Sequence, residues 1–166
     1  MLLLKPFVVL YTVILAVIAQ ESLISIRTPS LNQIVVPGQS VDIEYTVNAQ
    51  SSSTLIPNYP PSMDLYLRWK KNQEPHLELK AITGLSTQSI ASGTQPKTYH
   101  RRWKLPHCQF FKRYSPPEWS FTVEFEMRYS EDDARRISGP RQTTVVIPIQ
   151  INTTLSDHHH HNGCYQ

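Results

Sequence analysis

The sequence has few cysteines and glycines, and it lacks the common catalytic motifs. With two cysteines among 166 residues, the chain must fold around a hydrophobic core, and its length suits one domain. Thirteen prolines against five glycines, with no sustained 3.6-residue periodicity, argue against a helical protein. Because we find no Gly-X-Ser-X-Gly motif, metalloprotease helix or phosphate-binding loop, the sequence predicts a non-enzyme that needs no cofactor.

A strong excess of one charge is also missing. Residues 20–166 carry a formal net charge of +2, because Lys5 is the one charged residue before them and the whole chain carries +3. This balance does not predict binding to nucleic acid or to a membrane surface. No second long hydrophobic run follows the first, and the polar C-terminal end lacks the apolar tail of a glycolipid-anchor signal.

Residues 1–19 have the pattern of a secretory signal peptide. Lys5 gives a cationic start, an apolar run follows, and small residues precede a cleavage site before Gln20. The alternative is an uncleaved anchor, since the run approaches the roughly 20 apolar residues of a membrane span, although Tyr11 and Thr12 interrupt it. We expect cleavage, a secreted chain and no stable membrane insertion afterwards.

Alternation of apolar and polar residues dominates the rest of the chain. The clearest example is 119–129, where every second residue from Trp119 to Tyr129 is large and apolar. A shorter one is 76–82, where Leu77, Leu79 and Ala81 are expected to point inward. In all, seven segments show the pattern: 23–27, 40–48, 63–70, 76–82, 99–105, 119–129 and 143–152. Pro148, on the outward face of the last, indicates an edge strand or a bulge.

Seven short strands separated by turn signals predict an all-β protein. The expected fold is an antiparallel β-sandwich of the immunoglobulin or fibronectin III type, occupying residues 20–155 and followed by a His-rich polar tail, 156–166. Three long loops are predicted at 49–62, 84–97 and 106–118. Loops of that length commonly carry function.

The third of these loops contains aromatic and basic residues side by side. Exposed aromatic rings stack on sugar rings, and neighbouring cations suit acidic glycans or an acidic protein surface. The alternative is that the aromatic residues simply cover an end of the sandwich. The predicted contact surface consists of Phe110, Phe111, Lys112, Arg113 and Tyr114.

Cys108 and Cys164 are predicted to form a disulfide, because a secreted chain with two cysteines favours a bond between them. Two free thiols or an intermolecular bond are the alternatives. The disulfide would join the C-terminal tail to the loop that precedes the strongest predicted strand.

A row of four histidines in the tail could bind a metal ion. Neutral imidazole is a ligand for Zn and Cu, and the predicted disulfide would bring the row close to His107. Adjacent residues of an extended chain point to opposite sides, so adventitious Zn or Cu binding by a polar tail is the alternative. The candidate ligands are His107, His158, His159, His160 and His161.

Two further features concern the strand surfaces. Glu124 and Glu126 could suggest a glycosidase acid and base, but the pattern favours an outer charged face paired with Arg or Lys. Asn152 begins the sequence Asn-Thr-Thr, a standard N-glycosylation acceptor, so the protein is predicted to be a glycoprotein unless the acceptor is unused.

The sequence resembles the immunoglobulin-like domain of fungal cell-wall proteins of the Ser/Thr-rich, glycolipid-anchored and β-glucan-synthesis group. The similarity runs from about Ile24 to Ile151. It rests on Thr28-Pro29, the run from Val36 to Tyr45, Leu65-Tyr66-Leu67, Trp103-Lys104-Leu105-Pro106, Ser138-Gly139 and Ile149. The resemblance implies a wall-associated, non-catalytic domain linked to β-glucan assembly, and it transfers no binding residue.

Three functions therefore stay open from the sequence. The first is a secreted cell-wall or matrix protein that binds polysaccharide. The second is a secreted effector that binds an extracellular host or partner protein through the aromatic and basic loop. The third is an extracellular metal-binding protein that uses the histidine tail.

Overall fold

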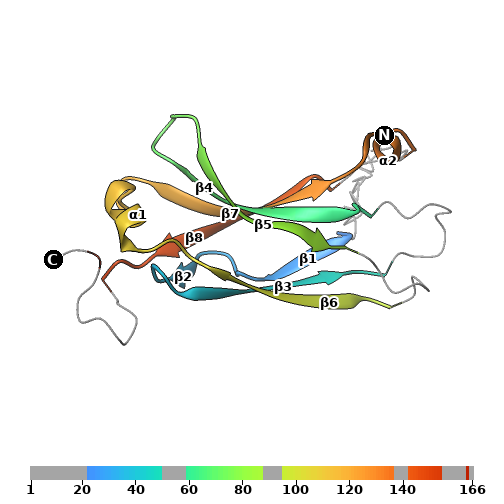
Figure 1. Ribbon diagram of the computed structural model, residues 1–166, viewed down its shortest axis with the longest axis horizontal. Helices are drawn as coiled ribbons and strands as arrows, with labels where there is room; N and C mark the ends of the chain where they lie inside the picture. Colours follow the sequence, from blue (N-terminus) through green and yellow to red (C-terminus); the bar gives the residue numbers. More distant parts are fainter. Residues whose placement is uncertain (1–21, 50–58, 88–94, 137–141, 155–163, 165–166) are drawn as a thin grey trace, which may run out of the picture.

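The computed structural model describes residues 22–49, 59–87, 95–136, 142–154 and 164, and these form two β-sheets packed face to face (Figure 1). One sheet has three antiparallel strands in the order β1-β3-β6, namely β1 (Ile24–Thr28), β3 (Ser40–Val47) and β6 (Lys97–Lys104). The other has five, in the order β2-β8-β7-β4-β5: β2 (Gln33–Val35), β8 (Thr144–Ile151), β7 (Ser120–Arg128), β4 (Ser62–Lys70) and β5 (Leu77–Ser86). The predicted all-β sandwich is confirmed.

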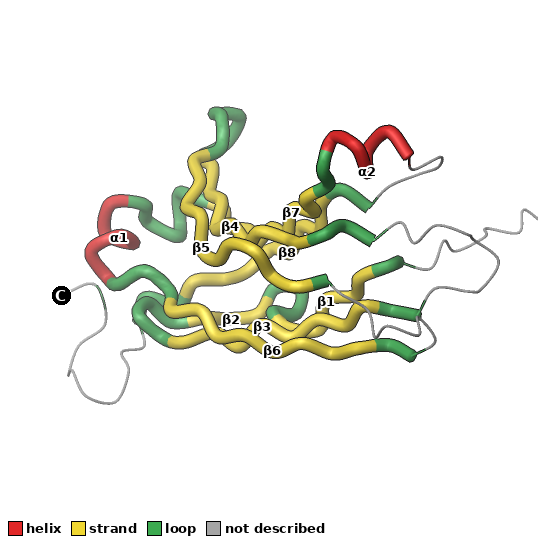
Figure 2. Tube along the Cα trace, turned by 45° about the vertical axis from the view of Figure 1, so that its right-hand side comes forward, coloured by secondary structure: helices red, strands yellow, loops and turns green. Residues whose placement is uncertain are grey.

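Two short helices among the described residues lie at opposite ends of the sandwich (Figures 1 and 2). One is α1 (Cys108–Arg113), between β6 and β7, and the other is α2 (Glu131–Arg136), between β7 and β8. The predicted loop 106–118 therefore contains a helix. The leader, the tail histidines and the loop residues 50–58 and 88–94 lie outside the described residues.

The alternating strands bury the faces that the sequence predicts. Every second residue of β7 from Phe121 to Met127 is buried, and so is every second residue of β3 from Val41 to Val47. Because β7 lies between β4 and β8 in the five-stranded sheet, its apolar face meets the middle of the core. Removing such faces from water is the main favourable term in folding.

The described residues form eight strands, one more than predicted. The additional strand, β2, has three residues and pairs in parallel with the last three residues of β8, so it is too short to show an alternation. Pro148 lies just before this pairing begins, and its carbonyl accepts a hydrogen bond from Asn32 N–H at 2.8 Å. The first half of β8 is therefore a sheet edge, as the proline indicated.

The prediction for β5 was wrong in burial and in length. Leu77 and Leu79 pair with Trp69 and Leu67 and share their inner face, yet they are 41% and 40% exposed. β5 is the outermost strand of the five-stranded sheet, so little of the smaller sheet covers it. The strand also continues to Ser86, and the predicted loop starts later than expected.

The outer face of the five-stranded sheet carries a network of ion pairs centred on Arg68 of β4. Its guanidinium lies 2.5 Å from Glu124 and 3.0 Å from Glu78, and it also binds Glu126. Burial alone would lower the pKa of Arg68, but the three carboxylates raise it above its ordinary value. The predicted pairing of Glu124 and Glu126 with a basic neighbour is confirmed.

A fourth carboxylate on this face, Asp64, is 7% exposed because long side chains from both neighbouring strands cover it. It accepts hydrogen bonds from Lys80 at 3.3 Å, from Arg128 at 3.0 Å and from Gly84 N–H at 3.0 Å. The last bond uses a backbone with φ of +67° at Gly84, a conformation that favours glycine. Burial would raise the pKa of Asp64, yet these hydrogen bonds hold it below its ordinary value.

We expect Asp64 to make the protein sensitive to acid. Its pKa is lower in the folded state than the ordinary value of about 3.9, so its contribution is present above about pH 4 and is lost as the pH falls through the folded value. Asp64→Asn should flatten the pH dependence of the unfolding free energy below about pH 5, and Asp64→Ala should cost about 1–3 kcal/mol at neutral pH. Urea titrations at several pH values measure both effects. An Asp64→Asn variant with an unchanged acid slope would contradict the prediction.

Candidate functional site

The helix α1 closes one end of the sandwich through a single buried ring. Phe111 is fully buried and packs against Phe121 of β7, with 5.5 Å between ring centroids. Phe111 was predicted to belong to a contact surface, and that prediction was wrong because the helix turns this side chain into the core. Lys112 and Arg113 are exposed, while Phe110 and Tyr114 are half-buried, so the remaining members of the predicted surface stay accessible.

A disulfide joins the first residue of α1 to the C-terminal segment. Cys108 and Cys164 are bonded, and Cys164 is buried with its N–H donating to the Thr153 carbonyl at 2.8 Å. The structure has the predicted intramolecular bond. The bond fixes the start of α1 to the segment that follows β8.

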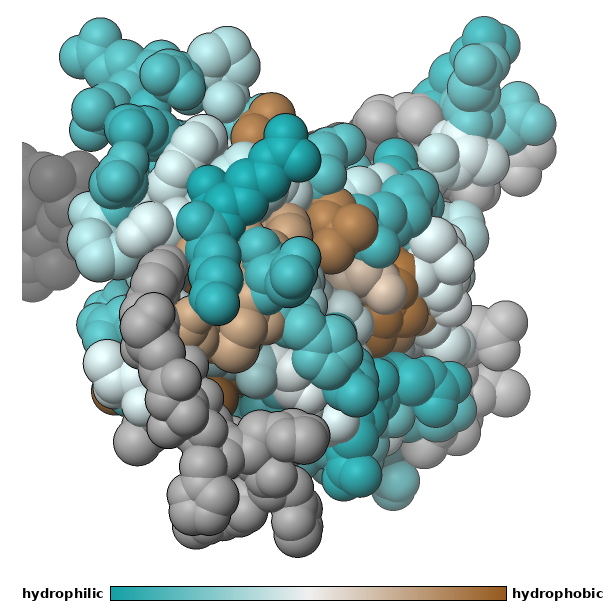
Figure 3. All heavy atoms as spheres, turned by 60° about the vertical axis from the view of Figure 1, so that its left-hand side comes forward, coloured by the Kyte–Doolittle hydropathy of each residue, from teal (hydrophilic) through white to brown (hydrophobic). Residues whose placement is uncertain are grey.

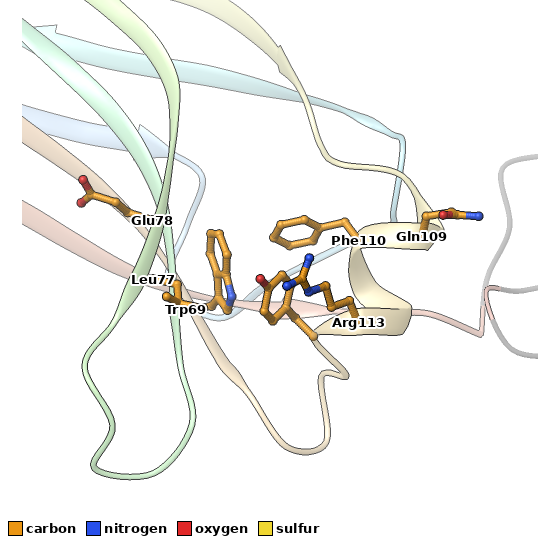
Figure 4. Close-up of a pocket in the computed structure, with 7 residues that line it drawn as sticks. Trp69, Leu77, Glu78, Gln109, Phe110 and Arg113 are labelled. Atoms are coloured by element: carbon orange, nitrogen blue, oxygen red, sulfur yellow. The ribbon is translucent and has the colours of Figure 1, made fainter.

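A groove of about 570 Å³ lies between α1 and the β4–β5 edge (Figure 4). Such a volume is typical of ligand sites. The space-filling view from the α1 end shows apolar surface between hydrophilic residues (Figure 3). The lining residues are Trp69, Leu77, Glu78, Gln109, Phe110, Arg113 and Tyr114.

Three aromatic rings hold the shape of the groove. Trp69 lies with its ring centroid 4.8 Å from Phe110 and 5.0 Å from Tyr114, and these two rings are 5.0 Å apart. Tyr114 also meets Trp119 edge to face at 5.2 Å. Edge-to-face and tilted pairs are favourable beyond the area that they bury, so the groove is formed by packing that exists before any ligand binds.

Arg113 is the charged group associated with these rings. Its guanidinium lies 5.4 Å from the centre of the Tyr114 ring, within cation–π distance. In Figure 4 the Glu78 carboxylate points away from the rings, toward the outer face where Arg68 binds it, and Gln109 also points away. The groove is therefore apolar with one cation.

Trp69 supplies an unpaired polar atom in the groove wall. The side chain is 6% exposed, and its indole Nε1 is buried with no hydrogen-bond partner among the described residues. Figure 4 shows this nitrogen on the side of the ring that faces α1. A buried donor without an acceptor costs about 1–3 kcal/mol, and a ligand oxygen would relieve that cost only after the rings around it shift to expose it.

The sequence prediction found the α1 half of the groove and missed the strand half. Trp69 and Leu77 face each other across the β4–β5 register, and each was expected to be ordinary core. The available signal was their position at the end of one alternating segment and the start of the next, which places both at the same end of the sheet.

Four of the five predicted metal ligands lie outside the described residues. His107 is exposed and precedes α1, with its ring 2.9 Å from where a Cβ on Gly38 would lie. His158 to His161 lie outside the described residues, and within the described ones no group of three or more His, Cys, Asp or Glu could hold a metal ion. Metal binding stays a prediction.

The predicted glycosylation acceptor lies just after β8. The Asn152 side-chain oxygen accepts hydrogen bonds from Thr154 N–H at 2.9 Å and from the Thr154 hydroxyl at 2.7 Å. This turn keeps the first and third residues of the acceptor sequence together in a partly exposed position. Glycosylation itself stays a prediction.

No protein-family model and no curated protein sequence matches the chain. Among the described residues, neither helix has the length and apolar character needed to cross a membrane.

We expect the disulfide to stabilise both the fold and α1. The bonded residues are 56 apart in sequence, and closing a loop of that size contributes about 2–4 kcal/mol. The Cys108→Ser/Cys164→Ser variant should lower the urea midpoint accordingly and increase amide hydrogen exchange in α1 before it does so in β7. Equal exchange rates for α1 in both proteins would contradict the proposed role of the bond.

Proposed function

We propose that the protein is a secreted, non-catalytic binding protein of a cell wall or extracellular matrix, and that it takes a polysaccharide into the groove beside α1. The observation that carries the proposal is the aromatic groove itself, formed by Trp69, Phe110 and Tyr114 with Arg113 above the last ring. Sugar rings present C–H groups on their faces, and these pack favourably against aromatic rings.

Two features support the proposed extracellular location of the protein. The predicted leader directs the chain into the secretory route, and a disulfide persists in the oxidising compartments that this route reaches. The resemblance to fungal cell-wall domains adds an expected setting, a wall built with β-glucan, and stays a prediction.

The arrangement of carboxylates supports binding without catalysis. Glycosidases generally use two carboxyl groups placed on either side of the bond to be cleaved. Glu78 is the one carboxylate among the residues that line the groove, and it is paired with Arg68 on the outer face. Glu124 and Glu126 are bound to the same arginine, so they form part of the ion-pair network.

Depletion from solution by insoluble β-glucan, chitin and mannan tests the proposal. We expect retention on at least one polymer and its loss in Phe110→Ala/Tyr114→Ala, because each truncation removes a wall of the groove. Leu31→Ala/Ile34→Ala is the matched control, since these side chains are 70% and 61% exposed and line no part of the groove. Phe111→Ala is unsuitable, since emptying this core site should cost about 3–5 kcal/mol.

Three results of this experiment would each mean something different. Equal retention of the groove variant and the wild-type protein would place binding elsewhere on the surface. The depletion is repeated with EDTA present, and retention that EDTA abolishes would favour the metal-binding alternative. The absence of retention on every polymer would overturn the proposed function and favour a protein partner.

A further inference from the structure

Many of the charges on the strands and their loops are matched in pairs. On the smaller sheet Asp42 binds Arg102 at 2.9 Å and Glu44 binds Arg27 at 3.1 Å. On the larger sheet and its loops the partners are equally close. They are Asp64 with Lys80 and Arg128, Glu118 with Lys71, and Arg68 with its three glutamates. The exposed strand cations outside these pairs are Lys70, Lys97, Arg101 and Lys104, and none of them lines the groove.

Helix α1 is different, since it contains two cations and no carboxylate. Lys112 and Arg113 form its last turn, and neither makes an ion pair with a described residue. The Arg113 guanidinium lies 5.4 Å from the centre of the Tyr114 ring. Glu78, the one carboxylate in the groove lining, is already bound to Arg68. The positive charge beside the rings is thus left for a ligand.

Arg113 provides a planar fork of N–H donors that matches a carboxylate or a phosphate in a bidentate manner. The Trp69 indole adds a donor in the groove wall. Its Nε1 is buried without an acceptor among the described residues, and hydroxyl, carboxylate and phosphate oxygens would each accept from it once the surrounding rings shift. The unpaired cation beside the aromatic rings is therefore what favours an acidic sugar over a neutral one.

We propose that the groove binds an anionic glycan, with a carboxylate or phosphate of the sugar on the Arg113 guanidinium and the sugar ring against Phe110 and Tyr114. This inference rests on the proposed function and narrows its ligand class. Neutral β-glucan would meet the same rings without the ion pair and would bind more weakly.

Isothermal titration calorimetry of the secreted protein with two hexasaccharides tests whether a negative charge on the sugar strengthens binding. One is a β-1,4-linked glucuronic acid hexamer and the other is cellohexaose, which carries a hydroxymethyl group in place of each carboxylate. At low salt we expect the acidic hexamer to bind about tenfold more tightly or better, as one well-placed charge-assisted contact allows. This preference should shrink as the salt concentration rises. A mannose-6-phosphate oligosaccharide and its unphosphorylated parent repeat the comparison for phosphate.

Variants distinguish an ion pair made by Arg113 from a general effect of the protein's positive charge. Arg113→Gln should weaken binding of the acidic hexamer by about tenfold and so remove most of its preference over cellohexaose. Lys97→Gln is the matched control, because it removes the same charge at the opposite end of β6, where Lys97 lies over the Tyr99 ring. Trp69→Phe keeps a ring and removes the donor, so it should weaken the binding of both hexamers. Because it also leaves a cavity in the core, its urea midpoint is measured alongside.

The outcomes distinguish this inference from the proposed function. Equal affinity for acidic and neutral sugars, with no effect of Arg113→Gln, would overturn the anionic ligand and leave polysaccharide binding intact. A preference for the phosphorylated sugar alone would assign the anion as phosphate. Equal binding of polyglutamate would overturn the glycan in favour of an acidic protein surface. No binding of any sugar, together with no retention on the polymers, would overturn both proposals.

Discussion

The packing of Phe111 against Phe121 is the contact on which the candidate site depends. Helix α1 has six residues, too few to be stable by itself in water, so it exists because one of its rings fills the end of the core. Once Phe111 is fixed, its neighbours Phe110 and Tyr114 must face Trp69 at the mouth of the sandwich. The disulfide at Cys108 holds the other end of the helix. Core and groove are therefore parts of one packed unit.

Long alternating segments made most of the fold predictable. In β7 the large apolar residues recur without a break from Phe121 to Met127, and only a strand with one buried face suits that pattern. The pairing of Cys108 with Cys164 was equally accessible, since two cysteines allow one intramolecular bond. These features depend on residue identity and order, which the sequence contains directly.

The features that escaped prediction depend on contacts between distant segments. Nothing in Gln-Phe-Phe-Lys-Arg distinguishes the ring that enters the core from the ring that stays at the surface. Asp64 lies on the outward phase of β4, a phase that alternation alone would leave in water, but Lys80 and Arg128 from adjacent strands cover it. The groove requires Trp69 and Leu77 to be opposed, and that register follows irregular pairing elsewhere along β4 and β5.

The strand β5 lies at the edge of the larger sheet, and this free edge affects whether the protein associates with itself in solution. A long free edge invites hydrogen bonding to another chain, which is how many β proteins aggregate. The pairing of β5 is interrupted by two irregularities, and Gly84 adopts a left-handed backbone within the strand. Glu78 and Lys80 place opposite charges on one face of the same edge. A straight partner strand would find neither a regular ladder nor a uniform surface there, so the edge resists self-association while remaining open beside the groove.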